Sequence, residues 1–193
     1  MIWFTADTHF GHANIIQHCH RPFANVEEMD RALVANINAR VKSGDTLYHL
    51  GDFAFRGAKP SFYRDQIRCR RLILILGNHD PQTAAGYPKP DFAAHFSEVH
   101  PLLRIKVAVN GSSQIIILCH YAMRVWDRAH YGTWHLFGHS HGSLPDDPCA
   151  RSCDVGVDHN AFQPLSLDEI ATIMNRKQFQ PIDHHRPESP SEL

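Results

Sequence analysis

The chain has 193 residues, of which 43% are hydrophobic and 20% charged, the composition of an ordinary soluble domain. Its 19 Lys and Arg residues balance 20 Asp and Glu residues, so there is none of the basic excess that nucleic-acid binders show. No apolar run approaches transmembrane length, no leader pattern precedes the first strand signal, and the 5 cysteines lack C-x-x-C spacing, so we expect a cytoplasmic protein. The unusual feature is the 16 histidines, because histidine is the commonest metal ligand.

Short apolar runs, each ended by glycine or polar residues, predict buried strands along the chain. These runs are Ile2–Ala6, Thr46–Leu50, Leu72–Leu76, Ile115–Cys119 and Trp134–Phe137. Another apolar run, Leu102–Val109, is followed by Asn-Gly at 110–111, which predicts a hairpin with the strand that comes next.

Helix signals fall between and after these strands. Asn25 and Glu28 form a capping box before apolar residues at helical spacing, and Gly44 closes that segment. Residues 61–70 are a weaker helix candidate, and Ser166 with Glu169 forms a second capping box. The alternation of strands and helices, followed by a hairpin, indicates an α/β fold with a mixed sheet or two packed sheets.

The chain shows no internal repeat, and residues 1–180 are predicted to form a single domain. From position 181 the composition shifts to Pro, His, Glu and Ser without periodicity, so residues 181–193 are predicted to be a flexible C-terminal tail.

Polar residues follow every one of the predicted strands. Ligands bind beyond the carboxyl ends of strands in open α/β sheets, so these side chains are expected to converge on one site. The candidate metal ligands are Asp7, His9, Asp52, Asn78, His120, His139 and His141. Seven oxygen and nitrogen donors exceed the four of a tetrahedral zinc site and suit two divalent ions that share one carboxylate. Such a site keeps a charge of about +2, which attracts phosphate and acidifies a bound water.

Local spacing assigns directions to these side chains. The pairs Asp7/His9 and His139/His141 are each two positions apart, and in extended backbone such positions face the same side. If Asn78 faces a metal, His79 is expected to point toward substrate, with Asp80 accepting its second N–H and fixing its tautomer.

The ordered series of motifs resembles the signature of calcineurin-like metallophosphoesterases and spans residues 5–141. It comprises Asp7-x-His9, Gly51-Asp52, Gly77-Asn78-His79-Asp80, His120 and Gly138-His139-Ser140-His141. The stretches Thr5–Ile16, Tyr48–Phe55 and Arg151–Asp158 further resemble small single-domain members from bacteria and phages.

The resemblance implies a four-layer α/β/β/α sandwich with mixed sheets and a dimetal site at the strand ends. It implies a first metal held by Asp7, His9, Asp52 and His141, and a second held by Asp52, Asn78, His120 and His139. Either site suits Mn, Fe, Ni, Co or Zn. The implied reaction is hydrolysis of phosphate mono- or diesters, in which a metal-bridging hydroxide attacks phosphorus and His79 acts as general acid.

Further residues are candidates for substrate contact. His12, Arg21 and Arg124 lie near the motifs. His12 is equally consistent with a helix start, whereas the interpretation of each arginine as a solvated surface charge is favoured over a phosphate contact. The expected partner is a small phosphoester, with a nucleotide-like substrate left open; neither a membrane nor a nucleic acid is favoured, and oligomeric state is not predicted. The alternative functions are a non-catalytic protein-interaction scaffold on the same fold and a metal-storage or sensing protein.

Overall fold

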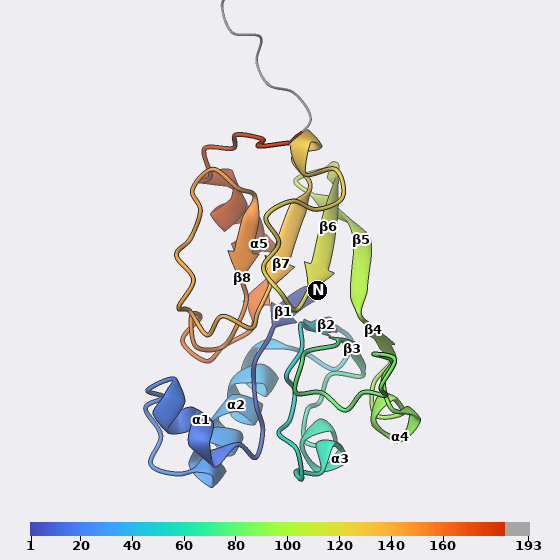
Figure 1. Ribbon diagram of the computed structural model, residues 1–193, viewed down its shortest axis with the longest axis vertical. Helices are drawn as coiled ribbons and strands as arrows, with labels where there is room; N and C mark the ends of the chain where they lie inside the picture. Colours follow the sequence, from blue (N-terminus) through green and yellow to red (C-terminus); the bar gives the residue numbers. More distant parts are fainter. Residues whose placement is uncertain (184–193) are drawn as a thin grey trace, which may run out of the picture.

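Two mixed β-sheets form the centre of the computed structural model, which describes residues 1–183 (Figure 1). The five-stranded sheet has the order β4-β3-β2-β1-β9, with bounds Glu98–His100, Arg71–Ile75, Thr46–His49, Ile2–Thr5 and Leu165–Ser166. The four-stranded sheet has the order β5-β6-β7-β8, with bounds Leu102–Val109, Ser112–Cys119, Trp134–Phe137 and Ser152–Asp154. All the predicted strands are present, and β5 and β6 form the expected antiparallel hairpin through Asn110 and Gly111, both of which have positive φ. The predicted tail at 181–193 falls mostly outside the described residues and stays a prediction.

The helices are α1 (Ala13–His18), α2 (Val26–Arg40), α3 (Pro60–Arg64), α4 (Pro90–Ala93) and α5 (Leu167–Asn175). The helix α2 begins where the sequence predicts, because the Asn25 side chain accepts the Glu28 backbone N–H at 2.9 Å. The helix α5 begins with the complete capping box of Ser166 and Glu169. The predicted helix at 61–70 is shorter in the structure and ends at Arg64.

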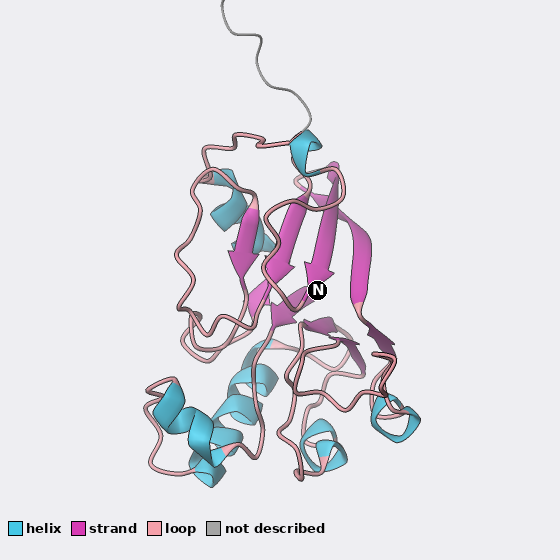
Figure 2. Ribbon diagram, viewed as in Figure 1, coloured by secondary structure: helices cyan, strands magenta, loops and turns pink. Residues whose placement is uncertain are grey.

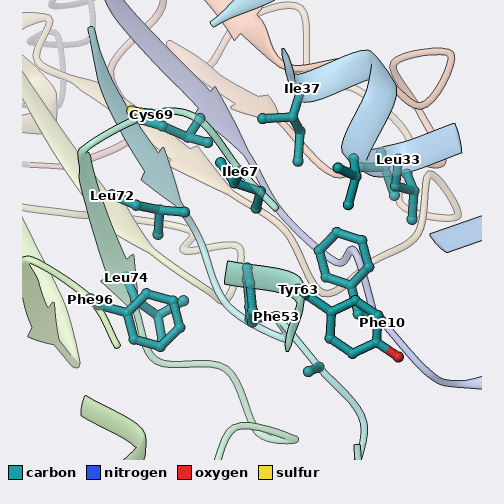
Figure 3. Packing of buried hydrophobic residues seen from close by; sticks show 14 of the residues in the cluster. Phe10, Leu33, Ile37, Phe53, Tyr63, Ile67, Cys69, Leu72, Leu74 and Phe96 are labelled. Carbon is teal, nitrogen blue, oxygen red and sulfur yellow. The ribbon is translucent and has the colours of Figure 1, made fainter. Parts of the chain in front are cut away.

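Apolar residues form two cores, one on each face of the five-stranded sheet. The first core lies between this sheet and the helices α2 and α3, and it contains Leu33 of α2, Tyr63 of α3 and Leu72 of β3 (Figure 3). The second core fills the space between the two sheets, and α5 packs against it through Ile170 and Met174. The fold is therefore the expected mixed α/β arrangement with two packed mixed sheets.

The outer face of the four-stranded sheet is covered mainly by loops, whereas α1–α4 gather beside the five-stranded sheet (Figure 2). The Trp126 ring of one such loop packs on His135 of β7, with the ring centroids 5.3 Å apart. Segments 121–133 and 142–151 show no helical periodicity, and apart from one 3-10 turn at Ala129–Tyr131 they cover this side of the sheet as loops.

In each sheet, parallel strands place their carboxyl ends next to one another. The strands β1, β2 and β3 are parallel to one another, as are β6, β7 and β8. Backbone hydrogen bonds continue past the strand ends, from the Asp7 N–H to the Gly51 carbonyl at 3.0 Å and from the Gly138 N–H to the His120 carbonyl at 2.9 Å. Within each sheet, the segments that follow neighbouring strands are thereby held side by side.

Candidate metal centre

The structure gathers the predicted metal ligands into two adjacent groups. In each group, one donor atom per residue lies within 4.8 Å of the others. The first group is Asp7, His9 and His141, and the second is Asp52, His120 and His139. Asn78 adjoins the second group, because its Oδ1 lies 3.0 Å from His120 Nε2. All seven candidates therefore lie close together in the structure.

Asp52 lies between the two groups. Its Oδ2 is 3.4 Å from His9 Nε2 in the first group and 3.5 Å from His120 Nε2 in the second. Its Oδ1 accepts the backbone N–H of His79 at 2.8 Å, which fixes the orientation of the carboxylate. The Asp52 carboxylate is therefore within reach of both groups.

The chemistry of the donors fits a metal ion. The His9 side chain is only 1% exposed, and neither ring nitrogen has a hydrogen-bond partner in the described part of the chain. Burial, followed by the charge of His141, lowers the pKa of His9 far below its usual range, so the ring stays neutral with a free lone pair. Burial and the charge of Asp52 raise the pKa of Asp7. A bound cation would satisfy the histidine and offset the crowding of the carboxylates.

Hydrogen bonds behind the ligands assign their tautomers. His120 Nδ1 donates to the Leu50 carbonyl at 2.7 Å, and His141 Nδ1 donates to Asp158 Oδ2 at 2.7 Å. Both rings therefore keep an Nε2 lone pair for a cation. Burial acts to raise the pKa of Asp158, but hydrogen bonds from His141 and Arg21 outweigh it and hold that pKa below the usual value.

The backbone at the ligands is strained. Left-handed φ values of 48° to 67° occur at five of them: Asp7, His9, Asp52, His139 and His141. Non-glycine residues rarely adopt this region, and such outliers concentrate at functional sites. The expectation that the paired ligands lie in extended backbone is therefore wrong, although Thr8 between them does point away, toward the Phe53 carbonyl at 2.7 Å.

Small residues make room for the ligands. A Cβ atom on Gly156 would lie 2.7 Å from Asp7 Oδ2, and one on Gly138 would lie equally close to the same oxygen. Gly138 belongs to a motif, whereas Gly156 was not singled out by the sequence. The sequence feature that could have pointed to Gly156 is the stretch Arg151–Asp158. This stretch resembles the small single-domain phosphoesterases but contains no predicted ligand.

The two candidate catalytic residues, His79 and Asp80, differ in their burial and in their contacts. The His79 ring is partly exposed and lies 5.2 Å from the His9 ring, at the edge of the ligand groups. Asp80 is buried and accepts the backbone N–H groups of Asp52, Phe53 and Gly77 at 2.8–2.9 Å. No hydrogen bond joins Asp80 to His79 within residues 1–183, so the expected contact that would orient the His79 ring is not formed. Asp80 instead fixes the backbone of the loop that carries Asp52. Burial raises the pKa of Asp80 to about 7.

The three candidate substrate residues lie in three different environments. His12 lies at the site, because its ring stacks on Phe55 at 3.8 Å and lies 5.4 Å from His9. Arg21 lies inside the protein, where its guanidinium is bound to Asp158 and to backbone carbonyls, so it does not face the ligand groups' open side. Arg124 is exposed and lines a cavity of about 350 Å³ to which none of the predicted ligands contributes.

Comparisons with known proteins identify the class. The family model of the calcineurin-like phosphoesterases matches residues 1–168, and the chain belongs to this family. An uncharacterized protein of Methanocaldococcus jannaschii, MJ1445, is 30% identical over 182 residues, covering 91% of this chain and 92% of that protein.

Two viral proteins are also similar to this chain in sequence, and one solved structure is similar in fold. The gene 66 proteins of Mycobacterium phages L5 and D29 are 28% and 24% identical, cover 90% of this chain, and are covered over 93% and 96% of their own lengths. The crystal structure of AQ665, a protein of unknown function from Aquifex aeolicus, superposes with a TM-score of 0.65 at 24% identity, covering 90% of this chain and 98% of that one. None of the helices in residues 1–183 has the length and apolar character needed to span a membrane.

Proposed function

We propose that the protein is a two-metal hydrolase of phosphate esters. The observation that carries the proposal is the position of Asp52 Oδ2, within 3.5 Å of a histidine nitrogen in each of the two ligand groups. A first divalent ion would be held by Asp7, His9, Asp52 and His141, and a second by Asp52, Asn78, His120 and His139.

The charges of the donors favour a phosphoester as substrate. The buried carboxylates of Asp7 and Asp52 would supply a charge of −2 to the bound ions, and the remaining donors are imidazole rings and an amide, which add no negative charge. Two bound divalent ions would supply Lewis acidity that activates water and neutralises charge growing on the phosphoryl oxygens. The ligand set is consistent with Mn, Fe, Ni, Co or Zn, and availability decides among them.

His79 is suited to donate a proton to the leaving oxygen. Its ring is partly exposed at the edge of the site, and its backbone N–H is fixed to the carboxylate of Asp52 at 2.8 Å. A general acid at this place needs access both to the substrate and to solvent protons. The stacked pair of His12 and Phe55 lies on the same side, with each ring 6.4 Å from His79, and so forms a wall beside the leaving group.

The proposed substrate is a small phosphoester, mono- or diester, with a nucleotide-like molecule included. The formal net charge of −1 gives the protein no overall electrostatic attraction for a long polyanion such as a nucleic acid. We infer that the protein acts in the cytoplasm.

The test is a metal and substrate panel. Protein stripped with a chelator is loaded with Mn, Fe(II), Ni, Co or Zn and assayed with nitrophenyl phosphate and bis-nitrophenyl phosphate, which separates monoesterase from diesterase activity. We expect hydrolysis with at least one ion, and loss of at least 100-fold in Asp52→Asn. The exposed residue Asp65 provides the matched control, and Asp65→Asn should retain activity. Two bound ions without hydrolysis of any ester in the panel would favour the interaction scaffold instead.

A further inference from the structure

We propose that Arg21 and Asp158 form a buried clamp that positions the predicted metal ligands His141 and Asp7; the proposal rests on the proposed metal centre. Two parallel hydrogen bonds join the pair, from Arg21 Nε to Asp158 Oδ1 at 2.7 Å and from Arg21 Nη2 to Asp158 Oδ2 at 2.8 Å. The side chains of Arg21 and Asp158 are 0% and 5% exposed. This is the fork geometry in which an arginine fixes the plane of a carboxylate.

The clamp joins three segments that are far apart in the sequence. Arg21 Nη2 also donates to the Asp7 carbonyl at 2.7 Å, and Nη1 donates to the Thr8 carbonyl at 3.0 Å. The same guanidinium thus holds the strained turn that carries Asp7 and the loop after β8 that carries Asp158. Arg21 itself is fixed at the end of α1, where its N–H donates to the Ile16 carbonyl at 2.9 Å.

Asp158, held in place by Arg21, in turn orients the His141 ring. Its Oδ2 accepts the His141 Nδ1–H at 2.7 Å, the one hydrogen bond that the ring makes to the described residues. The side chain of His141 is 22% exposed and its backbone is left-handed at φ 48°, so packing alone does not hold the ring. The carboxylate therefore selects both the tautomer and the direction of the Nε2 lone pair.

The clamp should act on one metal position more than on the other. Asp7 and His141 both belong to the first ligand group, whereas the second group of Asp52, His120 and His139 makes no hydrogen bond to Arg21 or Asp158 within the described chain. Loss of the clamp should therefore weaken the first position selectively, by about 10- to 100-fold, the usual effect of removing the partner of a metal-bound histidine.

Metal titration tests this directly. Chelator-stripped wild type and Asp158→Asn are titrated with Mn²⁺ by calorimetry, and spin coupling between adjacent ions is followed by electron paramagnetic resonance. We expect wild type to bind two ions, and Asp158→Asn to keep one position while the other weakens at least 10-fold, with loss of the spin coupling at limiting Mn²⁺.

Asp154→Asn is the matched control. Asp154 is also buried, lies on the same segment, and like Asp158 raises the pKa of Asp7, but its Oδ1 bonds the Gly156 N–H and not a predicted ligand. If charge alone mattered, both variants would lose affinity equally. Equal losses in the two variants, or equal weakening of both positions in Asp158→Asn, would overturn the clamp.

Arginine variants supply a second, independent measurement. Arg21→Lys keeps the charge but cannot form the planar fork, so we expect it to weaken the first position nearly as much as Asp158→Asn. The thermal transition of the metal-free protein shows that each variant is folded. Full affinity in Arg21→Lys would contradict the clamp even if Asp158→Asn failed to fold.

The outcomes separate the clamp from the proposed function. A wild type that binds two ions but hydrolyses no ester, while Asp158→Asn loses one position, would support the clamp and refute the hydrolase. A wild type that hydrolyses esters, while Asp158→Asn binds both ions normally, would do the reverse.

Discussion

Replacing the shared carboxylate should remove the stabilisation that metal ions give to both positions at once. A ligand at 100 times its dissociation constant stabilises the folded state by about 2.7 kcal/mol per site. Two such sites give about 5.4 kcal/mol, and a domain of this size gains about 2–4 °C in melting temperature per kcal/mol, so saturating metal should raise the transition of wild type by about 11–22 °C.

Asp52→Asn should reduce this metal-induced increase in melting temperature, because Asp52 lies near both ligand groups. Its Oδ2 lies 3.4 Å from His9 Nε2 and 3.5 Å from His120 Nε2, so the substitution removes a charged ligand from each position. If each affinity falls by about 100-fold, the same metal concentration equals the new dissociation constant and stabilises by only about 0.4 kcal/mol per site. Two sites then give about 0.8 kcal/mol, so the increase in melting temperature should shrink to about 2–3 °C.

The assay is a thermal melt of chelator-stripped protein with and without the best ion, and His139→Ala is its internal comparison. His139 belongs to the second ligand group alone, so its loss should leave about half of the metal-induced shift. Metal-free Asp52→Asn should be at least as stable as metal-free wild type, since it neutralises a carboxylate that raises the pKa of Asp7. An Asp52→Asn protein that keeps half of the shift, as His139→Ala does, would refute the bridging role.

Three further variants test other parts of the site. His79→Ala should lower turnover of alkyl esters by about 10²–10⁴-fold and of nitrophenyl esters far less, with unchanged metal-induced stabilisation; equal losses would remove His79 as the acid. Burial, together with the charge of His120, lowers the pKa of His49 to about 3, whereas in the unfolded chain it is about 6.5. The neutral ring therefore stabilises the fold above about pH 6.5, and this stability is lost as the pH falls toward 3. Metal-free protein should therefore lose about 2 kcal/mol between pH 7 and pH 5 through His49 alone, and urea unfolding of His49→Asn should show a smaller pH dependence; parallel curves would contradict this. Gly156→Ala should weaken metal binding because its Cβ would crowd Asp7 Oδ2 at 2.7 Å, whereas Gly44→Ala, with open space around it, should bind metal normally.

The strands and the convergence of the predicted ligands were accessible from the sequence for one physical reason. Apolar runs such as Leu72–Leu76 are followed within two residues by Asp, Asn or His, and burying an unpaired charge has no packing advantage. Parallel strands place such residues at a common edge, which the register of β1, β2 and β3 confirms. The pattern is local, so it can be read without knowing the fold.

What the sequence did not reveal depends on contacts between distant segments. Arg21 and Asp158 are 137 positions apart, and nothing near Arg21 distinguishes a buried fork from a surface charge. Asp80 follows His79 directly, yet the backbone N–H groups of the neighbouring Asp52 loop engage its carboxylate instead. The left-handed ligand backbones were missed for the same reason, because tertiary contacts impose them against local preference.

These features make the site a concentrated source of instability in the bare chain. The ligand-bearing turns are strained, the buried His9 ring has no hydrogen-bond partner in residues 1–183, and the carboxylates of Asp7 and Asp52 crowd each other. A fold selected for stability alone would replace such residues, since each of these features costs free energy. Multivalent cations relieve the last two together, because they accept imidazole lone pairs and neutralise carboxylates. The same substitutions that abolish metal binding should therefore leave the metal-free protein equally or more stable, and that opposition of signs separates a metal site from a merely structural cluster.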